Sequence, residues 1–381
     1  MSRSPVAIRA DRVFDGERMR ERATVVLENG LVRELCASLD LACETLDLGP
    51  GSLLAPGFID VQVNGGGGVL FNDEPSVSGL RTIAEAHRRF GTTGLLPTLI
   101  SDRREMIARA IAAVREALEA RVPGILGIHL EGPFINPRRK GAHPAGCIVE
   151  ITEGDIDLLA SLGPAGTTLV TLAPECVPPG TIRELTRRGI HVCAGHTEAG
   201  PDELSAAFEE GLAGFTHLYN AMAPLAGRAP GTVGVALVED QGFAGIITDG
   251  FHVAPISVRL AWKVMGPARM MLVTDAMSPV GTNVEGFDLL GARVRVADGR
   301  CTLADGTLAG SALDMAAAVR NCTSFGIPLE DALAMASGTP ARFLSRPDLG
   351  RIAPSACADL VALDANGSAT HTWIAGELAR A

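Results

Sequence analysis

Eight short apolar runs recur along the middle of the chain, and most are separated by segments with helical periodicity. The runs cover residues 58–64, 94–100, 124–131, 168–175, 191–196, 214–220, 244–249 and 270–275. Apolar residues three and four positions apart predict helices at 80–90, 104–120, 202–210, 256–264, 312–325 and 329–344. Strands that alternate with helices in this way predict an α/β fold, a (β/α)8 TIM-type barrel. A glycine-rich β insertion, about 282–309, interrupts the last turn.

The two ends of the chain are predicted to form one small β domain. Strand-like segments cover 6–13, 24–27, 31–35, 358–363 and 370–374, and Asn29-Gly30 and Asn366-Gly367 mark hairpin turns. Neither end is long enough to bury a core alone. We therefore expect residues 1–55 plus 350–381 to pack as a small β-sandwich domain beside a metal-dependent catalytic barrel of residues 56–349.

Charge and cysteine content narrow the expected partners and compartment. The chain carries 33 basic and 44 acidic residues, a net charge of −11. An acidic surface repels phosphate backbones and anionic lipid, so neither nucleic acid nor a membrane is an expected partner, whereas a small anionic substrate stays possible. Eight scattered cysteines without a C-x-x-C pair favour reduced thiols in a cytoplasmic protein. We see no apolar run of membrane-spanning length and no signal peptide.

Polar side chains follow the predicted strands at the barrel end where active sites lie. They are Gln62, Asn64, His129, Glu131, Glu175, His196, His217, Asp249, His252 and Asp275. Among them, Glu131, His196 and His217 offer one carboxylate and two imidazoles, a common zinc set that leaves a position for water. A single strand-end histidine is more often structural, but three convergent positions favour a metal site. A carboxylate buried there without a cation would carry a large desolvation cost.

Four residues on the same face are candidates for catalysis or substrate binding. Asp275 ends the eighth run and could accept a proton from metal-bound water, or else cap the next segment. His143 and His252 lie in loops, where each could polarise a carbonyl, bind a sugar hydroxyl or be solvated. Arg228 follows the sixth run and could bind phosphate through its guanidinium, although a lone arginine is usually only solvated.

Several segments resemble the N-acetylglucosamine-6-phosphate deacetylase family of the amidohydrolase superfamily. They are PGFIDVQVNG at 56–65, HLEGPF at 129–134, KGAH at 140–143, LAPE at 172–175, AGHT at 194–197, THLYNAM at 216–222, DGFH at 249–252 and VTDA at 273–276. The resemblance covers essentially the whole chain in order, and HLEGP and THLYNAM are fairly specific to this family. It implies hydrolysis of the acetamide of N-acetyl-D-glucosamine 6-phosphate to D-glucosamine 6-phosphate and acetate.

The resemblance also implies roles for individual residues. Glu131, His196 and His217 would hold one divalent metal, commonly zinc or iron. Asp275 would act as general base and then acid, and His143 would help polarise the acetyl carbonyl. The substrate-binding residues would be His143, His252, the backbone of Asn220 and Ala221, and Arg228, the last reaching the phosphate from the neighbouring subunit of a homodimer.

The first strand departs from the commonest amidohydrolase pattern. Many amidohydrolases carry H-x-H there, whereas this chain has Gln62 and Asn64 near the metal site, which resembles the single-metal branch of the deacetylases. Neutral amides are weak ligands for zinc, so one metal is expected.

Two alternatives remain open at this stage. One is a different amidohydrolase, such as an N-acyl-amino-acid deacylase or a cyclic-amide hydrolase. Cyclic-amide hydrolases usually use a strand-four lysine to bridge two metals, and the run 168–175 has none. The other is a non-catalytic barrel, which would typically have lost the candidate ligands that this chain retains.

Overall fold

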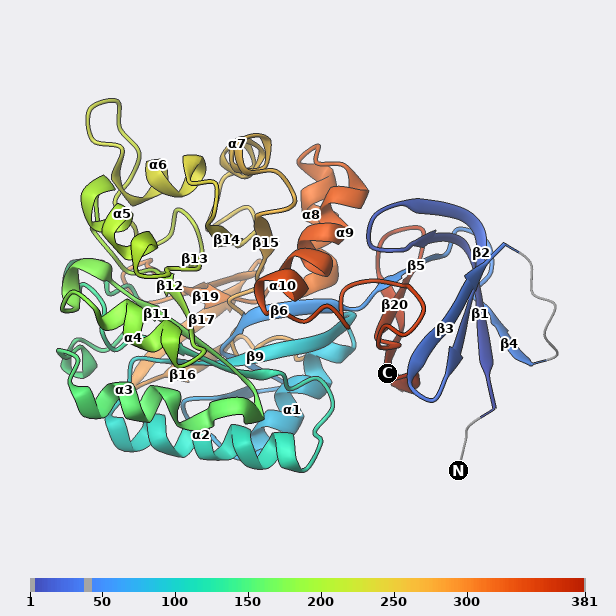
Figure 1. The fold of residues 1–381 in the computed structure, drawn as a ribbon, viewed down its shortest axis with the longest axis horizontal. Coiled ribbons are helices and arrows are strands. Elements are labelled where there is room, and N and C mark those ends of the chain that lie inside the picture. The colour runs from blue at the N-terminus through green and yellow to red at the C-terminus, as the bar shows by residue number, and fades with distance from the viewer. Residues whose placement is uncertain (1–3, 38–42, 380–381) are drawn as a thin grey trace.

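Eight parallel strands form a nearly closed barrel in the larger part of the computed structural model, which describes residues 4–37 and 43–379 (Figure 1). Along the chain they are β6 (Phe58–Val63), β9 (Thr92–Ile100), β10 (Gly127–Glu131), β11 (Thr167–Leu172), β12 (His191–Ala194), β13 (Gly214–Phe215), β14 (Phe243–Ile246) and β15 (Met270–Leu272). Each strand pairs with its neighbour in sequence order. Every predicted run overlaps one of these strands, so the predicted barrel is confirmed.

The barrel strands read as continuous apolar runs because both of their faces are covered. All nine residues of β9 are buried, for example, which is typical of parallel strands enclosed by helices. The helices around them are α1 (Val77–Arg88), α2 (Arg104–Glu119), α3 (Glu153–Leu159), α4 (Thr181–Arg187), α5 (Pro201–Glu209), α6 (Gly231–Val238), α7 (Pro255–Met265), α8 (Met315–Ser324), α9 (Leu329–Ala336) and α10 (Gly338–Phe343). Their apolar faces join the strands in one continuous core.

The helix prediction was wrong in two respects. The segment 329–344 is not one helix, because the chain breaks at Ser337 (φ −135°, ψ −72°) between α9 and α10. The Ser337 hydroxyl donates to the carbonyl of Leu333, and Pro340 has no N–H to continue the ladder. Helices α3, α4 and α6 were not predicted. The first two have only seven residues each, and α6 (GTVGVALV) is apolar nearly all round, so no helical period shows in its sequence.

The chain ends pair in one eight-stranded sheet beside the barrel, as predicted (Figure 1). Its strands are β1 (Val6–Phe14), β2 (Met19–Glu28), β3 (Leu31–Cys36), β4 (Glu44–Asp47), β5 (Leu53–Pro56), β20 (Leu360–Leu363), β21 (Ala369–Ile374) and β22 (Glu377–Ala379). The antiparallel pair β5 and β20 joins the two ends, and Ile8, Leu54, Leu360 and Trp373 share a separate hydrophobic cluster. Residues 1–3, 38–42 and 380–381 of the predicted β domain lie outside the described residues.

Two small β elements complete the fold. The predicted insertion is a four-stranded antiparallel sheet of β16 (Gly286–Leu289), β17 (Ala292–Ala297), β18 (Arg300–Thr302) and β19 (Leu308–Ser311). Its apolar residues pack against Leu70, Ile100 and Met277 at the C-terminal end of the barrel. The short strands β7 (Gly65–Gly66) and β8 (Val69–Leu70) pair just after the first barrel strand.

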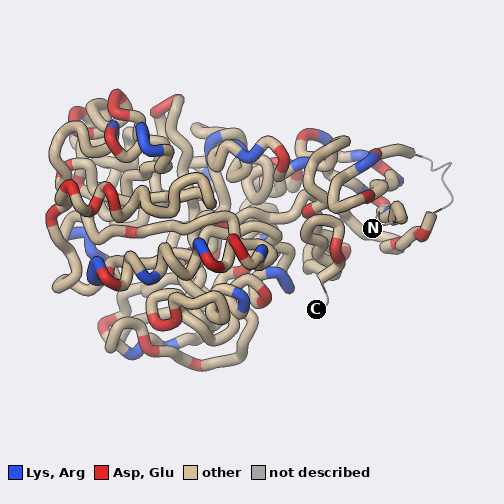
Figure 2. Tube along the Cα trace, turned by 60° about the horizontal axis from the view of Figure 1, so that its bottom comes forward, with Lys and Arg blue, Asp and Glu red and all other residues tan. Residues whose placement is uncertain are grey.

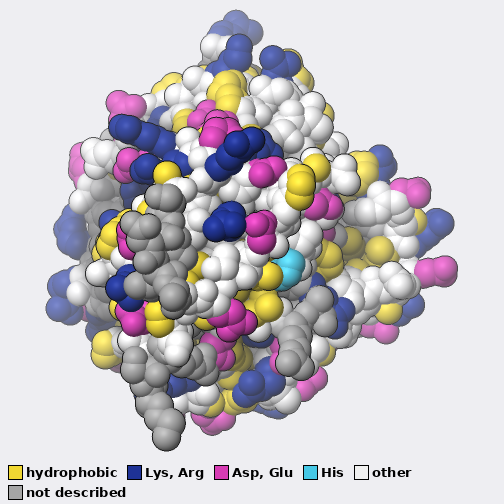
Figure 3. All heavy atoms as spheres, turned by 90° about the vertical axis from the view of Figure 1, so that its right-hand side faces the viewer, with side chains coloured by type: hydrophobic (Ala, Val, Ile, Leu, Met, Phe, Trp, Pro, Cys, Tyr) yellow, Lys and Arg dark blue, Asp and Glu magenta, His cyan; other side chains and the backbone are white. Residues whose placement is uncertain are grey.

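Charged residues of both signs are distributed over the outer helices and the β domain (Figure 2). The β-domain side shows hydrophobic side chains in small patches between charged ones (Figure 3). Among the described residues, no helix combines the length and the apolar character needed to cross a lipid bilayer.

Candidate metal and catalytic site

The C-terminal ends of the barrel strands surround a cavity of about 350 Å³. Most of the predicted site residues line it, namely Glu131, His143, His196, His217, Asn220, Ala221, His252 and Asp275. Gln62 and Asn64 are buried and contact two of these carboxylates. Arg228 is the exception, since it is exposed and does not line the cavity.

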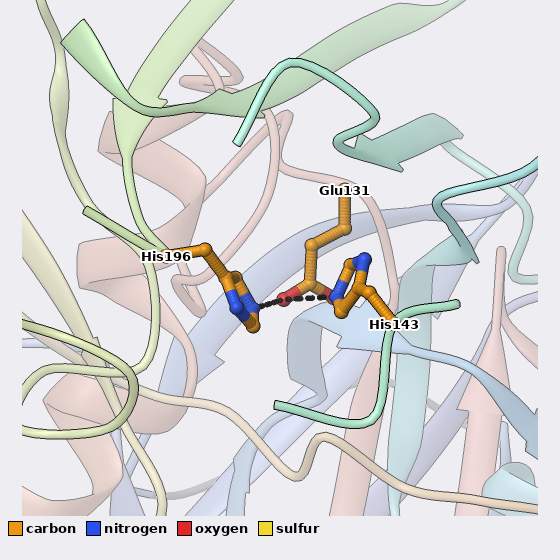
Figure 4. Close-up of side chains that lie close together, drawn as sticks. All are labelled: Glu131, His143 and His196. Atoms are coloured by element: carbon orange, nitrogen blue, oxygen red, sulfur yellow. Dashed lines mark hydrogen bonds and ion pairs between the residues drawn. The ribbon is translucent and has the colours of Figure 1, made fainter. Parts of the chain in front are cut away.

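Glu131 lies at the centre of the buried imidazoles. Its Oε1 is 2.9 Å from Nε2 of His196 and 2.9 Å from Nε2 of His217, and these two nitrogens are 3.0 Å apart. His143 is farther away, with its Nε2 at 3.9 Å from Oε1, although it also belongs to the compact Glu131, His143 and His196 group that could hold a metal (Figure 4). Ligands of a tetrahedral zinc ion lie about 3.3 Å apart, since each is ~2.0–2.1 Å from the metal. The spacing of Glu131, His196 and His217 is close to that value.

The second ring nitrogens of His196 and His143 distinguish a ligand from a donor. Nδ1 of His196 lies 2.7 Å from the carbonyl oxygen of Arg139, which can only accept, so the neutral ring carries its proton on Nδ1. The Nε2 lone pair then faces a carboxylate oxygen, an arrangement that is repulsive unless a cation lies between them. A metal ion therefore fits this group.

His143 has the opposite tautomer. Its Nδ1 accepts a hydrogen bond from the backbone N–H of Ser101 at 3.2 Å, and the Ser101 hydroxyl lies 2.7 Å from the same atom. Because a backbone N–H can only donate, the neutral ring carries its proton on Nε2, which faces Glu131. Burial lowers the pKa of His143 to about 4, so the ring is neutral at pH 7. This geometry makes His143 a hydrogen-bond donor rather than a metal ligand.

Two amide side chains orient the carboxylates. Asn64 Nδ2 donates to Asp275 Oδ1 at 2.6 Å, and Gln62 Nε2 lies 3.3 Å from both Asp275 Oδ1 and Glu131 Oε2. A carboxylate accepts only, so the NH₂ groups face it, and the amide oxygens, through which Asn and Gln would bind a metal, are turned away from the carboxylates. Burial, reinforced by the negative charge of Glu131, raises the pKa of Asp275 to about 6.

Left-handed backbone conformations gather around the cavity. The φ angles are positive at His196 (50°), His217 (34°), Tyr219 (79°), Ala221 (51°) and Asp275 (51°). Such conformations cost about 1–3 kcal/mol each in non-glycine residues and persist where surrounding contacts enforce them. Backbone strain is therefore present at the strand ends that carry the polar groups.

The substrate candidates lie at different depths. His252 lines the cavity, and Asp249 holds it through a 2.7 Å contact between Oδ2 and Nδ1. Arg228 lies instead at the tip of a hairpin closed by the Ala226–Ala229 bridge, which projects beside α6 (Figure 1).

Five of the ten strand-end residues do not line the cavity. Gln62 and Asn64 contact its carboxylates and Asp249 holds His252, whereas Glu175 and His129 have other partners. Glu175 accepts hydrogen bonds from Asn136, Thr197 and the N–H of Glu198, so it fixes the loop after His196. His129 lies between Thr98 and Thr171 within the barrel. The prediction that every polar strand-end side chain converges on one pocket was therefore too broad.

Sequence reasoning missed part of the cavity wall. The additional lining residues are Ile100, Arg138, Arg139, Gly141, Ala142, Met277, Thr307, Leu308 and Gly310. The basic run 138–140, close before His143, was a visible signal for Arg138. Nothing local marks Thr307 to Gly310, because only the packing of the β insertion brings them to the cavity.

Comparison with known proteins agrees with this geometry. Residues 53–379 match the Amidohydrolase family. The chain is 47% identical to an N-acetylgalactosamine-6-phosphate deacetylase of Shewanella sp. (strain ANA-3), over 86% of this chain and 83% of that protein. It is 35% identical to the N-acetylglucosamine-6-phosphate deacetylase of Haemophilus influenzae, over 93% and 94%.

A solved structure agrees over almost the entire length. The crystal structure of N-acetylglucosamine-6-phosphate deacetylase from Pasteurella multocida superposes with a TM-score of 0.94 at 34% sequence identity, covering 98% of this chain and 99% of that one. The barrel, the sheet built from both chain ends and the buried carboxylate–imidazole group thus occur in a chain that belongs to the amidohydrolase family and, within it, to the N-acetylhexosamine-6-phosphate deacetylases.

Proposed function

We propose that this chain hydrolyses the acetamide of N-acetyl-D-glucosamine 6-phosphate, releasing acetate and D-glucosamine 6-phosphate. The observation that carries the proposal is the position of Asp275, in one cavity with the Glu131, His196 and His217 group. In this proposal those three residues hold one divalent metal, while Asn220, Ala221 and His252 contact the substrate. Zinc or iron is the proposed ion, since two imidazoles and a carboxylate suit either.

Asp275 and His143 would divide the chemistry between them. A bound divalent cation supplies a water ligand of lowered pKa and polarises a carbonyl oxygen. Asp275 accepts a proton from the attacking water while the water oxygen bonds to the acetyl carbon. The Nε2–H of His143 donates to the carbonyl oxygen as negative charge develops there. Asp275 then returns the proton to the sugar nitrogen, so that the C–N bond breaks and a neutral amine leaves.

The galacto epimer is a second candidate substrate. The relative from Shewanella that is 47% identical is named for N-acetylgalactosamine 6-phosphate, whereas the relative from Haemophilus at 35% is named for the gluco compound. The two sugars differ only in the configuration at C4, so one site could hydrolyse both.

Acetate release from three compounds tests the proposal. We would measure kcat/KM for the two phosphorylated epimers and for unphosphorylated N-acetylglucosamine. We expect turnover of at least one phosphorylated epimer and far weaker turnover of the unphosphorylated sugar; the ratio between epimers identifies the preferred substrate. Hydrolysis of an N-acyl amino acid or a cyclic amide, with no acetate from any sugar, would contradict the proposal.

We also propose a homodimer in which Arg228 reaches the partner's phosphate site. Its hairpin projects from the barrel, and α7 on the same side exposes Ile256 (70%), Leu260 (47%) and Val264 (46%) (Figure 1). These residues are spaced four apart on one helix face, and an exposed apolar stripe of this kind favours contact with another protein surface.

The proposed compartment is the cytoplasm. Cys147, Cys193, Cys301 and Cys322 are free thiols, and the last three are buried. Unpaired thiols at several positions suit a reducing compartment.

A further inference from the structure

A buried carboxylate below the cavity has no place in the mechanism above. Asp60 is fully buried, and burial raises its pKa to about 7 although hydrogen bonds from Thr274 and Gln62 oppose the rise. Its Oδ2 accepts the hydroxyl of Thr274 at 2.5 Å, while Oδ1 accepts the N–H groups of Gln62 at 3.1 Å and Thr274 at 3.3 Å. Neither Lys nor Arg is among these partners, so the carboxylate is retained at a desolvation cost.

Asp60 lies at the seam of the barrel. Continuous parallel ladders join β6 through β15 in order, but these first and last strands share no ladder. They are linked near their C-terminal ends by the isolated bridge between Val63 and Ala276. There the N–H of Asp275 donates to the carbonyl of Gln62 at 3.0 Å, and the N–H groups of Asn64 and Gly65 donate to the carbonyl of Ala276 at 2.8 and 2.9 Å. The Asp60 side chain supplies hydrogen bonds across the gap where strand pairing is sparse.

The same contacts fix the backbone on both sides of Asp275. The Thr274 hydroxyl donates to Asp60 and also accepts the N–H of Ala276 at 3.2 Å. Ser311 donates through its hydroxyl to the carbonyl of Thr274 at 2.6 Å and through its N–H to the carbonyl of Asp275 at 2.9 Å. Asp275 has a left-handed backbone (φ 51°), which such a set of contacts can enforce.

We propose that Asp60 and Thr274 are positioning residues, a buried carboxylate–hydroxyl pair that closes the barrel seam and holds Asp275 in its left-handed conformation. The pair aims the Asp275 carboxylate at Asn64 and into the cavity. The catalytic consequence rests on the proposed function, in which Asp275 transfers the proton. The effect on the left-handed conformation of Asp275 does not depend on the proposed function.

The test compares three variants of the full-length, metal-loaded protein. Thr274→Val keeps the shape but removes the hydroxyl, Thr274→Ser keeps the hydroxyl, and Thr248→Val is the matched control. Thr248 follows the neighbouring strand β14, is fully buried and donates to the carbonyl of Ala318, away from Asp275. Loss of a buried threonine hydroxyl is thus common to Thr274→Val and the control.

We expect Thr274→Val to lower kcat by about 10²-fold, the scale of a misplaced catalytic group, with KM and metal content little changed. Thr274→Ser and Thr248→Val should keep kcat close to wild type. Equal losses in Thr274→Val and Thr248→Val, an unchanged kcat in Thr274→Val, or loss of its metal would each overturn the proposal. If Thr274→Val does not fold, Asp60→Asn should show the same change in kcat alone.

A crystal structure of Thr274→Val separates this inference from the proposed function. We expect residue 275 to leave the left-handed region or to lose its 2.6 Å hydrogen bond from Asn64. An unchanged conformation would overturn the inference even in an active enzyme. A wild-type protein that releases no acetate would instead overturn the proposed function. The crystal structure of Thr274→Val would still test whether Asp60 and Thr274 position Asp275.

Discussion

Asp275 differs from Glu131 in what its oxygens contact. The pKa of Glu131 is held well below its usual range against the effect of burial, first by the hydrogen bond from His143 and then by the imidazoles of His196 and His217. Asp275 receives hydrogen bonds from two neutral amides, and its pKa is raised. Two carboxylates in one cavity therefore have different chemistry: Glu131 suits a permanent ligand and Asp275 suits a group that gains and loses a proton.

Asp275→Asn should keep the metal and lose nearly all turnover. The amide retains the size of the side chain but cannot accept a proton, and general acid–base assistance typically contributes ~10²–10⁴ in rate. Metal content by elemental analysis and kcat for the phosphorylated sugar check this. Retention of more than a tenth of the wild-type kcat would remove Asp275 from the role of base.

Activity should fall on the acid side as Asp275 becomes protonated. Its raised pKa of about 6 means that the basic form is abundant above pH 6 and scarce below it. We expect kcat/KM to be constant well above the pKa of Asp275 and to fall about tenfold per pH unit well below it. A bound cation would lower this pKa and so move the fall in kcat/KM to lower pH. Circular dichroism at each pH checks that the protein stays folded. A profile flat down to pH 4 would contradict the assignment.

At the scale of elements, the hairpin that carries Arg228 is proposed to bind the substrate phosphate, and this can be tested by substitution. Arg228→Ala should raise KM for the phosphorylated sugar by about ten- to a hundredfold, since charge-assisted hydrogen bonds contribute ~1.5–3 kcal/mol. KM for the unphosphorylated sugar should not change. Arg187, an exposed arginine on α4, provides the control Arg187→Ala, which should leave both constants unchanged.

Mixed subunits test whether the arginine acts across a dimer. If Arg228 serves the partner's site, mixing Arg228→Ala with Asp275→Asn should restore part of the activity, because some hybrid sites regain both groups. Subunit exchange is verified by mass spectrometry of the mixed dimers. Verified exchange without recovery would place Arg228 outside the partner's site.

At the scale of the whole molecule, we propose that residues 1–55 plus 350–381 form one domain and residues 56–349 the catalytic barrel. A hydrophobic cluster confined to the chain ends supports this division, although Phe14, Leu53 and Val361 of the β domain pack into the barrel core. Helices α8 to α10 lie between the barrel strands and the β domain in Figure 1. By their residue numbers they belong to the proposed catalytic barrel.

The whole site should need only one metal per chain. A second ion would require ligands from the first strand, where Gln62 and Asn64 turn their amide nitrogens toward carboxylates. We expect apo protein to regain full activity at one equivalent of zinc or iron per chain. The measurement is a titration of the apo protein with metal, in which the activity and the metal content of each sample are determined. A plateau only at two equivalents would show that a second site exists.

The sequence by itself determined the barrel and the titratable groups that line the cavity at the strand ends. Eight apolar runs were visible because strands enclosed on both faces need no polar alternation. Parallel strands place their C-terminal ends together, so Glu131, His196, His217 and Asp275 could be assigned to one site before any coordinates. The short helices α3 and α4 and the break at Ser337 escaped, because their sequences carry too little periodicity.

Only the tertiary structure decided how those side chains are held. The amide of Asn64 and the carboxylate of Asp275 are 211 positions apart, and Asp60 and Thr274 are 214 apart. The tautomer of His143 depends on Ser101, 42 positions away. Each arrangement is set by a hydrogen bond between strands or loops that meet only in the folded barrel. Local sequence fixes a residue's strand and the direction of its side chain, but its partners depend on how the barrel closes.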